Sequence, residues 1–318
     1  MKIKNIVFGL MLVSQFFWAN AQEIRGSIVS NDNKVVVHST QIRNRLYPYA
    51  NTLQPIIGYI DTNVTGRMGL EKHTNIALSK GHNVKLTIDL ELQQQIESIL
   101  DAGQALYGAD EILAAVMESN TGKVLAMASS NRYDTSHITE DDIPAIFQKF
   151  SAYPYEPGSV IKPLTLAIAL EHGTVQPTTV FDTYPGRLEI GKGHFISDDD
   201  KFDSLSATDI IVHSSNVGIS QIAWELTGKE LRDGLLKFGL GIASEIELIE
   251  NLPGAIKSVD MLDHKLHRAN SSYGYGLLAN FTQLLKAYSV FNNEGKAVSP
   301  HLIESIQEKR ERSSLPIQ

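Results

Sequence analysis

Short apolar runs bounded by turn-forming residues predict strands in two parts of the chain. Residues 25–29 and 34–37 flank an Asn-Asp-Asn turn, and residues 84–88 form a third short run. Residues 112–117 and 123–128 are joined through Ser-Asn-Thr-Gly, which is typical of a hairpin. The pattern therefore predicts a small, irregular β-rich unit near the N-terminus and a separate hairpin further along the chain.

Helical periodicity of the apolar positions predicts a long helix between these two groups of strands. Asp89 stands where it can cap a helix that runs through Leu106. The apolar face predicted for this helix consists of Leu92, Ile96, Ile99 and Leu100.

The second half of the chain is predicted to be mainly helical. A helix from Ser159 to His172 is expected to end at Gly173. Its buried face is expected to hold Val160, Leu164 and Ile168. The other predicted helices run from Ser206 or Thr208 through Val212, over Ile219–Leu226 up to Gly228, over Leu231–Phe238 and over Phe281–Tyr288, and a strand is expected to start at residues 298–300.

Composition excludes several kinds of chemistry. The formal net charge of −8 gives no reason to expect nucleic acid as a partner, and the absence of cysteine excludes disulfides, thiol catalysis and cysteine-ligated zinc. The ten histidines show no metal-ligand spacing. The acidic run 198–200 lacks the spacing and closing glutamate of a calcium loop, so we expect a solvated turn there. We predict neither a metal nor a cofactor.

The N-terminus has the pattern of an export signal. Lys2 and Lys4 precede an apolar run over residues 6–19, which ends in Ala19-Asn20-Ala21. The run is shorter than a typical span of about 20 residues, so we predict a signal peptide over residues 1–21 that is cleaved after Ala21. An uncleaved membrane anchor is the alternative, and either one places the rest of the chain outside the cytoplasm.

Ser159 and Lys162 are candidates for acyl-transfer chemistry. They stand three residues apart at the start of an apolar helix, so they share one helix face. Burial of the lysine would favour its neutral amine, which can deprotonate the serine hydroxyl. Amide groups at the helix N-terminus can help to stabilise an oxyanion. The bare S-x-x-K pattern also fits a capping serine beside a solvated lysine, and its context decides between the two readings.

That context resembles a known family. The stretch Tyr155 to Pro163, which reads Tyr-Glu-Pro-Gly-Ser-Val-Ile-Lys-Pro, resembles the first active-site motif of the penicillin-binding, serine–lysine acyltransferase superfamily. Ser214-Ser215-Asn216 fits the second motif of that superfamily, S-x-N. Residues 129–131 have the same three letters, but only the copy at 214–216 lies between two predicted helices downstream of the Ser-Lys pair.

The resemblance implies a role for each matched residue. Ser159 is expected to be the acyl-accepting nucleophile and Lys162 its base. Ser214 is expected to relay the proton between Lys162 and the leaving amine, and Asn216 to hold the substrate amide.

Residues 25 to about 305 resemble class B penicillin-binding proteins, and the division-type transpeptidases most of all. The implied fold is α+β, an α/β sandwich of the penicillin-binding and beta-lactamase-like kind. The implied division is a signal or anchor (1–21), a remnant of the family's N-terminal pedestal (22–83) and a transpeptidase domain (84–318).

The third motif of the family, Lys-Thr-Gly or Lys-Ser-Gly, does not occur in the chain. By resemblance it should fall beyond residue 318, so we expect a transpeptidase fold that is incomplete at its C-terminus. The central sheet would then be reduced to a hairpin, with one face of the helical layer uncovered.

Three functions are compatible with these features. The first is an exported peptidoglycan D,D-transpeptidase, or carboxypeptidase, at the periplasmic face of the inner membrane. It would take stem peptides as substrates, beta-lactams as covalent inhibitors and membrane proteins of the division complex as partners. The second is a truncated, non-catalytic relative that acts as a binding module or is a gene remnant. The third, a beta-lactam sensor or beta-lactamase, is disfavoured by the pedestal-like N-terminus.

Overall fold

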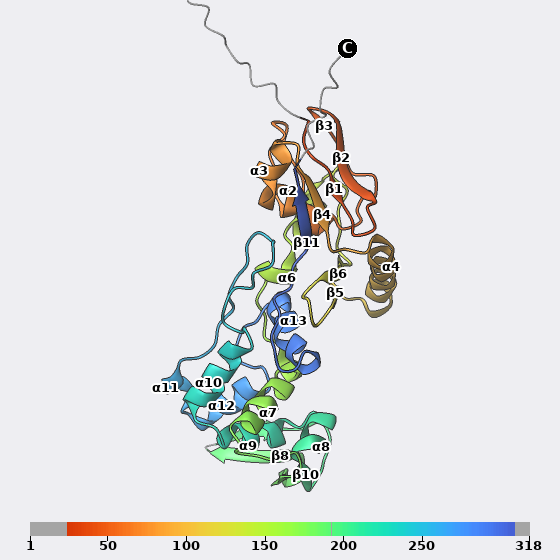
Figure 1. Cartoon of the computed structure of the whole chain (residues 1–318). Helices are drawn as coiled ribbons and strands as arrows, with labels where there is room; N and C mark the ends of the chain where they lie inside the picture. Colours follow the sequence, from red (N-terminus) through yellow and green to blue (C-terminus); the bar gives the residue numbers. More distant parts are fainter. Residues whose placement is uncertain (1–23, 192, 309–318) are drawn as a thin grey trace, which may run out of the picture.

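The computed structural model describes residues 24–191 and 193–308. Figure 1 shows an elongated chain, with a β-sheet and short helices at one end and a group of helices at the other. The signal or anchor predicted for residues 1–21 lies outside the described residues. Within them, no helix has the length and apolar character needed to span a bilayer.

The N-terminal part is built around a five-stranded sheet in the order β11-β4-β1-β2-β3. Strand β1 pairs antiparallel with β2 and parallel with β4, and β11 pairs antiparallel with β4. The strands are β1 (Ile28–Val29), β2 (Val35–Gln41), β3 (Asn44–Leu46), β4 (Asn83–Leu86) and β11 (Ile303–Gln307). The predicted strands at 25–29, 34–37 and 84–88 are confirmed in this sheet.

The last strand starts later than predicted and pairs with the N-terminal sheet. The predicted start lies at residues 298–300. The next residue, His301, donates its N–H to the Gly122 carbonyl (2.9 Å) and accepts from the N–H of Val124 (3.1 Å). These bonds tie the segment to the hairpin, so β11 begins only at Ile303. Because β4 and β11 both belong to the N-terminal sheet, a domain boundary at residue 84 passes through β4.

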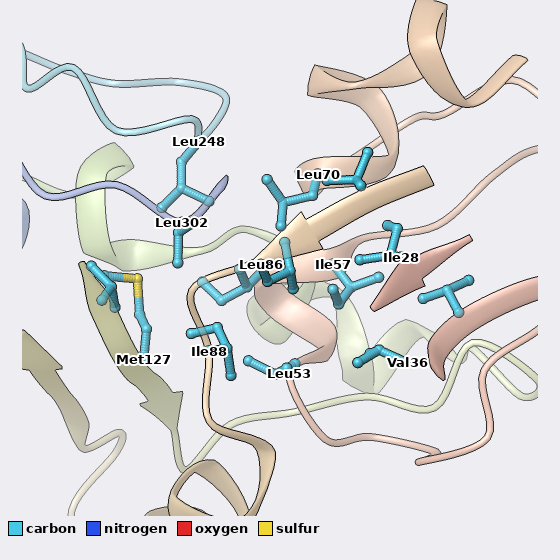
Figure 2. Packing of buried hydrophobic residues seen from close by; sticks show 14 of the residues in the cluster. Ile28, Val36, Leu53, Ile57, Leu70, Leu86, Ile88, Met127, Leu248 and Leu302 are labelled. Carbon is cyan, nitrogen blue, oxygen red and sulfur yellow. The ribbon is translucent and has the colours of Figure 1, made fainter. Parts of the chain in front are cut away.

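Apolar side chains from distant parts of the chain pack beside this sheet. Figure 2 shows Leu248 and Leu302 from the C-terminal half together with Leu86 and Ile88. All four side chains are buried. Three short helices contribute to the same region: α1 (Gln54–Ile57), α2 (Gly69–His73) and α3 (Asn75–Ser79). The hydrophobic core thus joins the two ends of the described chain.

A buried ionic cluster crosses the N-terminal part. Glu71 of α2 accepts hydrogen bonds from Arg25 and Arg45, with N–O contacts of 2.6 Å and 2.7 Å. The three side chains are at most 3% exposed. Buried charges of this kind persist only when they are paired, so Glu71 holds together segments that lie far apart in the sequence.

Helix α4 (Leu90–Tyr107) begins where the sequence predicts. Asp89 accepts a hydrogen bond of 3.0 Å from the backbone N–H of Leu92, and this satisfies one of the free donors of the first turn. Gly108 ends the helix in the left-handed conformation, with φ +61°.

The predicted apolar face of α4 is wrong in part, because the buried face holds Gln93 and Glu97 while Ile99 is 67% exposed. The Gln93 amide accepts from the N–H of Met127 (2.8 Å) and donates to its carbonyl (3.1 Å), as a neighbouring strand would. Glu97 accepts from Gln93 (2.8 Å) and from the backbone N–H of Leu53 (2.9 Å). The buried face of α4 therefore includes polar residues with satisfied hydrogen bonds, and it differs from the face that the apolar periodicity indicates.

The predicted hairpin is confirmed as β5 (Leu113–Met117) and β6 (Val124–Ser129), which pair antiparallel. Among the described residues this sheet has two strands, as expected. The connection from β6 to the Ser159 region contains three short helices. They are η1 (Glu140–Asp142), α5 (Ile143–Ile146) and α6 (Lys149–Ala152).

The helical part lies at the other end of the molecule (Figure 1). It consists of η2 (Gly158–Ile161), α7 (Lys162–Glu171), α8 (Ala207–Val212), α9 (Asn216–Trp224), α10 (Gly228–Lys237), α11 (Val259–Leu262), α12 (Lys265–Ser272), α13 (Phe281–Ser289) and η4 (Val290–Asn292). Its core includes Leu164 and Ile168 of α7, Ile210 of α8 and Ile219 of α9. Gly234 lets α10 approach closely, because a Cβ there would lie 2.5 Å from Ile168.

Most of the predicted helices are confirmed, with local corrections. Ser206 caps α8, as one of the two predicted alternatives, and accepts from the N–H of Asp209. Gly228 opens α10 and does not end α9, because Thr227 and Glu230 form a capping box there. Val160, expected to be buried, is 43% exposed. It precedes α7 in a 3₁₀ turn, where the helical face has not yet begun. Helices α11 and α12 were not predicted.

Two small two-stranded sheets lie between α7 and α9 in the sequence. Strands β7 (Val180–Asp182) and β10 (Ser204–Ser206) pair with each other, as do β8 (Arg187–Gly191) and β9 (His194–Ser197). The 3₁₀ turn η3 (Tyr184–Gly186) precedes β8. The acidic run 198–200 directly follows β9, and its Asp198 accepts hydrogen bonds at the N-terminus of α9. Mixed helices and sheets confirm the predicted α+β class.

Candidate active site

Ser159 lies in the 3₁₀ turn η2, immediately before α7. Gly158 precedes it with φ +66°, a conformation that favours glycine, and Pro163 occupies the first turn of α7, where its missing N–H costs nothing. The serine side chain is exposed. The sequence thus presents the hydroxyl at the open end of a helix whose following turns are buried.

A second loop holds the Ser159 turn from outside. The N–H of Gly158 donates to the carbonyl of Gly274 (3.3 Å), and the Glu156 carboxylate accepts from the N–H of Gly276 (2.7 Å). Gly274 has φ +87°, and a Cβ at this position would lie 2.1 Å from the Gly158 carbonyl oxygen. The Tyr-Gly-Tyr-Gly segment at residues 273–276 therefore supports the candidate nucleophile directly.

Lys162 is the buried member of the site, with a relative exposure of 2%. Its Nζ donates to the Ser214 hydroxyl (2.9 Å) and to the Ser214 carbonyl oxygen. Burial lowers the pKa of the Lys162 ammonium to about 8, although the charges of Asp198 and Asp199 act in the opposite direction. The desolvation predicted from the sequence is thus present, and it makes the neutral amine accessible near physiological pH.

Ser214 occupies a strained position between α8 and α9. Its φ of +54° is unusual for a residue with a side chain, and such strain is found at functional sites. This backbone turn directs both the carbonyl and the hydroxyl of Ser214 to Lys162. The structure therefore unites Lys162 with Ser214 across 52 residues of sequence.

Asn216 begins α9, and its side-chain nitrogen donates to the Ser197 carbonyl at 2.9 Å. The preceding residue, Ser215, caps the helix by accepting from the N–H of Gly218 (2.8 Å). Asn216 is half-buried. The capping residue Ser215 thus separates the two predicted residues of the second motif. Ser214 contacts Lys162, and Asn216 contacts β9.

The acidic run 198–200 is expected from the sequence to be a solvated turn, but its first residue contacts the start of α9. Asp198 accepts from the Ser215 hydroxyl (2.6 Å) and from the backbone N–H groups of Asn216 (2.5 Å) and Val217 (3.0 Å). Negative charge is favoured at a helix N-terminus because the free N–H groups point there. Local sequence could not reveal this, since the carboxylate stands far ahead of the helix in the chain.

The structure does not bring every predicted site residue into contact. Within the described residues, no hydrogen bond joins Ser159 to Lys162, whose amine is directed to Ser214 instead. The alternative Ser-Ser-Asn copy lies at the end of β6, where Ser129 donates to Glu111 (2.6 Å) and Asn131 to the Asp110 carbonyl (3.1 Å). These contacts are structural and separate from the Lys162 site.

The fold and the site define a protein of the serine–lysine type, in which an exposed serine precedes a buried, partly neutral lysine by three residues. Residues 112–318 match the family described as the penicillin binding protein transpeptidase domain. The chain therefore belongs to the penicillin-binding protein transpeptidase family, and the predicted resemblance to class B penicillin-binding proteins is confirmed.

Curated relatives agree with this assignment. The chain is 28% identical over 285 residues to the peptidoglycan D,D-transpeptidase FtsI of Escherichia coli K12, with 81% of this chain and 48% of that protein covered. It is 31% identical over 230 residues to FtsI of Buchnera aphidicola subsp. Schizaphis graminum, with 71% and 39% covered. The chain spans about half the length of the curated relatives it matches.

Solved structures show the same fold. Penicillin-binding protein 3 of Mycobacterium tuberculosis, in its apo form, matches with a TM-score of 0.83 and 27% identity, covering 91% of this chain and 70% of that one. The same protein complexed with ampicillin matches equally well, with a TM-score of 0.83. A putative peptidoglycan glycosyltransferase of Atopobium parvulum matches with a TM-score of 0.81 and 28% identity.

Proposed function

We propose that this chain acts as a peptidoglycan D,D-transpeptidase that cross-links stem peptides during division, through an acyl-enzyme on Ser159. The state of Lys162 carries the proposal: its amine is buried, has a pKa lowered to about 8 and donates a hydrogen bond to Ser214. The exposed Ser159 stands three residues before it. The names of the relatives support peptidoglycan as the substrate.

The reaction begins with transfer of the Ser159 hydroxyl proton to neutral Lys162. The serine oxygen then attacks the penultimate D-Ala carbonyl of one stem peptide, and the peptide bond to the terminal D-Ala breaks. Ser214 passes the proton from Lys162 to the departing D-Ala amine. An amine of a second stem peptide then attacks the acyl-enzyme and loses a proton to Lys162. The ester bond to Ser159 breaks, and the serine oxygen takes up that proton. Asn216 holds the amide of the acyl-donor peptide, and N–H groups at the start of α7 stabilise the oxyanion.

Beta-lactams take the place of the stem peptide in this scheme and acylate the same serine. Two of the similar solved structures are complexes of the Mycobacterium tuberculosis protein with aztreonam and with ampicillin, which supports this extension. We further propose that the chain is exported and works outside the cytoplasm, at the membrane surface. Its N-terminal part (22–83) would serve, with the strands β4 and β11 that complete its sheet, as the pedestal that meets division-complex membrane proteins. The rest of residues 84–318 would carry the transpeptidase.

Acylation by a fluorescent penicillin tests the proposal. The purified chain is expected to carry label that survives a denaturing gel, and Ser159→Ala is expected to remove it. Ser79→Ala, at an exposed serine of α3, is the matched control and should label like the parent. Label that persists in Ser159→Ala would exclude Ser159 as nucleophile. A folded parent chain that takes no label would favour the non-catalytic alternative.

A further inference from the structure

Asp198 connects the two halves of the candidate site, although no site motif contains it. Its carboxylate accepts three hydrogen bonds from the segment that carries the second motif: the Ser215 hydroxyl, the Asn216 N–H and the Val217 N–H. Each bond is between 2.5 and 3.0 Å long. The carboxylate thus fixes the start of α9 from outside the helix.

The charge of Asp198 also acts on Lys162. The negative charges of two carboxylates, Asp198 and Asp199, favour the protonated form of Lys162. Asp198 is the larger of the two influences. Of the two, only Asp198 also hydrogen-bonds to the loop that bears Ser214 and Asn216.

We propose that Asp198 is a positioning residue for acyl transfer: it holds the Ser214–Asn216 loop against Lys162 and balances the positive charge that Lys162 gains. The inference rests on the proposed function of the Ser159 site. It assigns to a residue outside the two motifs a role in both the geometry and the electrostatics of the reaction.

The chemistry explains why a carboxylate suits this place. When Ser159 is deprotonated, its proton moves to the Lys162 nitrogen, and the serine oxygen forms a bond to the substrate carbonyl carbon. Lys162 then carries a positive charge in a buried setting, where charge is unfavourable without a partner. A fixed carboxylate nearby stabilises that charge at the moment it forms, without any reorganisation. The same carboxylate neutralises the free N–H groups of α9.

The three consecutive acidic residues allow a matched experiment. Asp198→Asn removes the charge and disturbs the bond to Ser215, but its amide oxygen can still accept from both backbone N–H groups. Asp199→Asn removes a charge that acts on Lys162 and leaves the loop's hydrogen bonds to Asp198 intact. Asp200→Asn removes a charge to which the structure assigns neither effect. Each variant is made in the full chain and checked by circular dichroism.

The measurement is the rate of penicillin acylation as a function of pH. Asp198→Asn is expected to lower the maximal rate about 10- to 100-fold, because small displacements of reacting groups have effects of this size. It is also expected to move the rising limb of the profile to lower pH, since the group that raises the pKa of Lys162 has gone. Asp199→Asn should move the limb in the same direction with a smaller loss of rate, and Asp200→Asn should do neither.

Two further variants separate position from charge. Asp198→Glu keeps the charge but not the geometry, so it should restore the pH limb towards the parent value without restoring the rate. Ser215→Ala removes one donor to Asp198 together with the cap on the Gly218 N–H, and it should lower the rate without moving the limb. It keeps the proposal testable if Asp198→Asn does not fold. A folded Asp198→Asn with the rate and pH profile of Asp200→Asn would overturn the inference. An unlabelled parent chain would instead overturn the proposed function.

Discussion

The acylation rate of this protein should rise with pH through a midpoint near 8. Lys162 must be neutral to accept the Ser159 proton, and burial lowers its pKa from 10.5 to about 8. At pH 7 a group with a pKa near 8 is neutral in about one molecule in ten, whereas at an unperturbed pKa it would be neutral in about one in 3,000. The structure therefore predicts a reactive population about 300-fold larger than that of an exposed lysine.

The acylation rate should rise with pH near pH 8 because burial of Lys162 lowers its pKa to about 8. Desolvation disfavours the charged ammonium, so the neutral amine becomes common as pH rises through the lowered pKa, and the rate should level off above about pH 9. Lys162→Met, which keeps much of the side-chain volume, should lose acylation at every pH. Lys229→Met is the control, because Lys229 has a side chain that is 72% exposed and pairs only with Asp233 in the described residues.

The assay is stopped-time labelling with a fluorescent penicillin in buffers from about pH 5.5 to 10, corrected for the separate hydrolysis of the reagent. A rate that is flat over this range would refute the reasoning, because it would mean that no group with a lowered pKa controls the reaction. A midpoint near the unperturbed pKa of 10.5 would also refute it, since Lys162 would then not be desolvated.

Two predictions concern positions outside the two motifs. Gly274→Ala should lower the acylation rate more than about tenfold in a folded protein, because its Cβ would lie 2.1 Å from the Gly158 carbonyl oxygen and would displace the Ser159 turn. Glu71→Ala should lower the free energy of unfolding by about 3–5 kcal/mol, because it leaves Arg25 and Arg45 charged and unpaired in the interior. Urea unfolding, followed by circular dichroism, measures the second effect.

Each of these predictions has a matched control. Gly295 also has a positive φ (+76°), but a Cβ at this position would meet no atom within 4 Å, so Gly295→Ala should leave acylation unchanged. Glu171 forms an exposed pair with Lys237 at 3.4 Å, so Glu171→Ala should cost less than about 1 kcal/mol. Equal acylation in the two glycine variants, or equal stability in the two glutamate variants, would contradict the corresponding argument.

Local interactions were predictable because they depend on residues that are neighbours in sequence. Asp89 and Ser206 cap their helices as expected, since each needs only the N–H groups of the next turn. The hairpin at 113–129 is confirmed for the same reason. The S-x-x-K spacing likewise keeps Ser159, in the turn η2, three residues ahead of Lys162 at the start of α7.

Interactions between distant segments were not predictable from periodicity. The buried face of α4 carries Gln93 and Glu97 because Met127 and Leu53 supply hydrogen-bond partners from elsewhere in the chain. Hydrogen bonds offset the cost of burying a polar residue, but its partners are known only once the chain has folded.

The sequence by itself therefore determined the chemical groups of the site and their local presentation, while the tertiary structure decided their environment. Burial of Lys162, its contact with Ser214 and the carboxylate of Asp198 at the start of α9 all join segments that are remote in the chain. A side chain's pKa depends on the solvent and the charges around it in space, and the order of residues alone does not specify these.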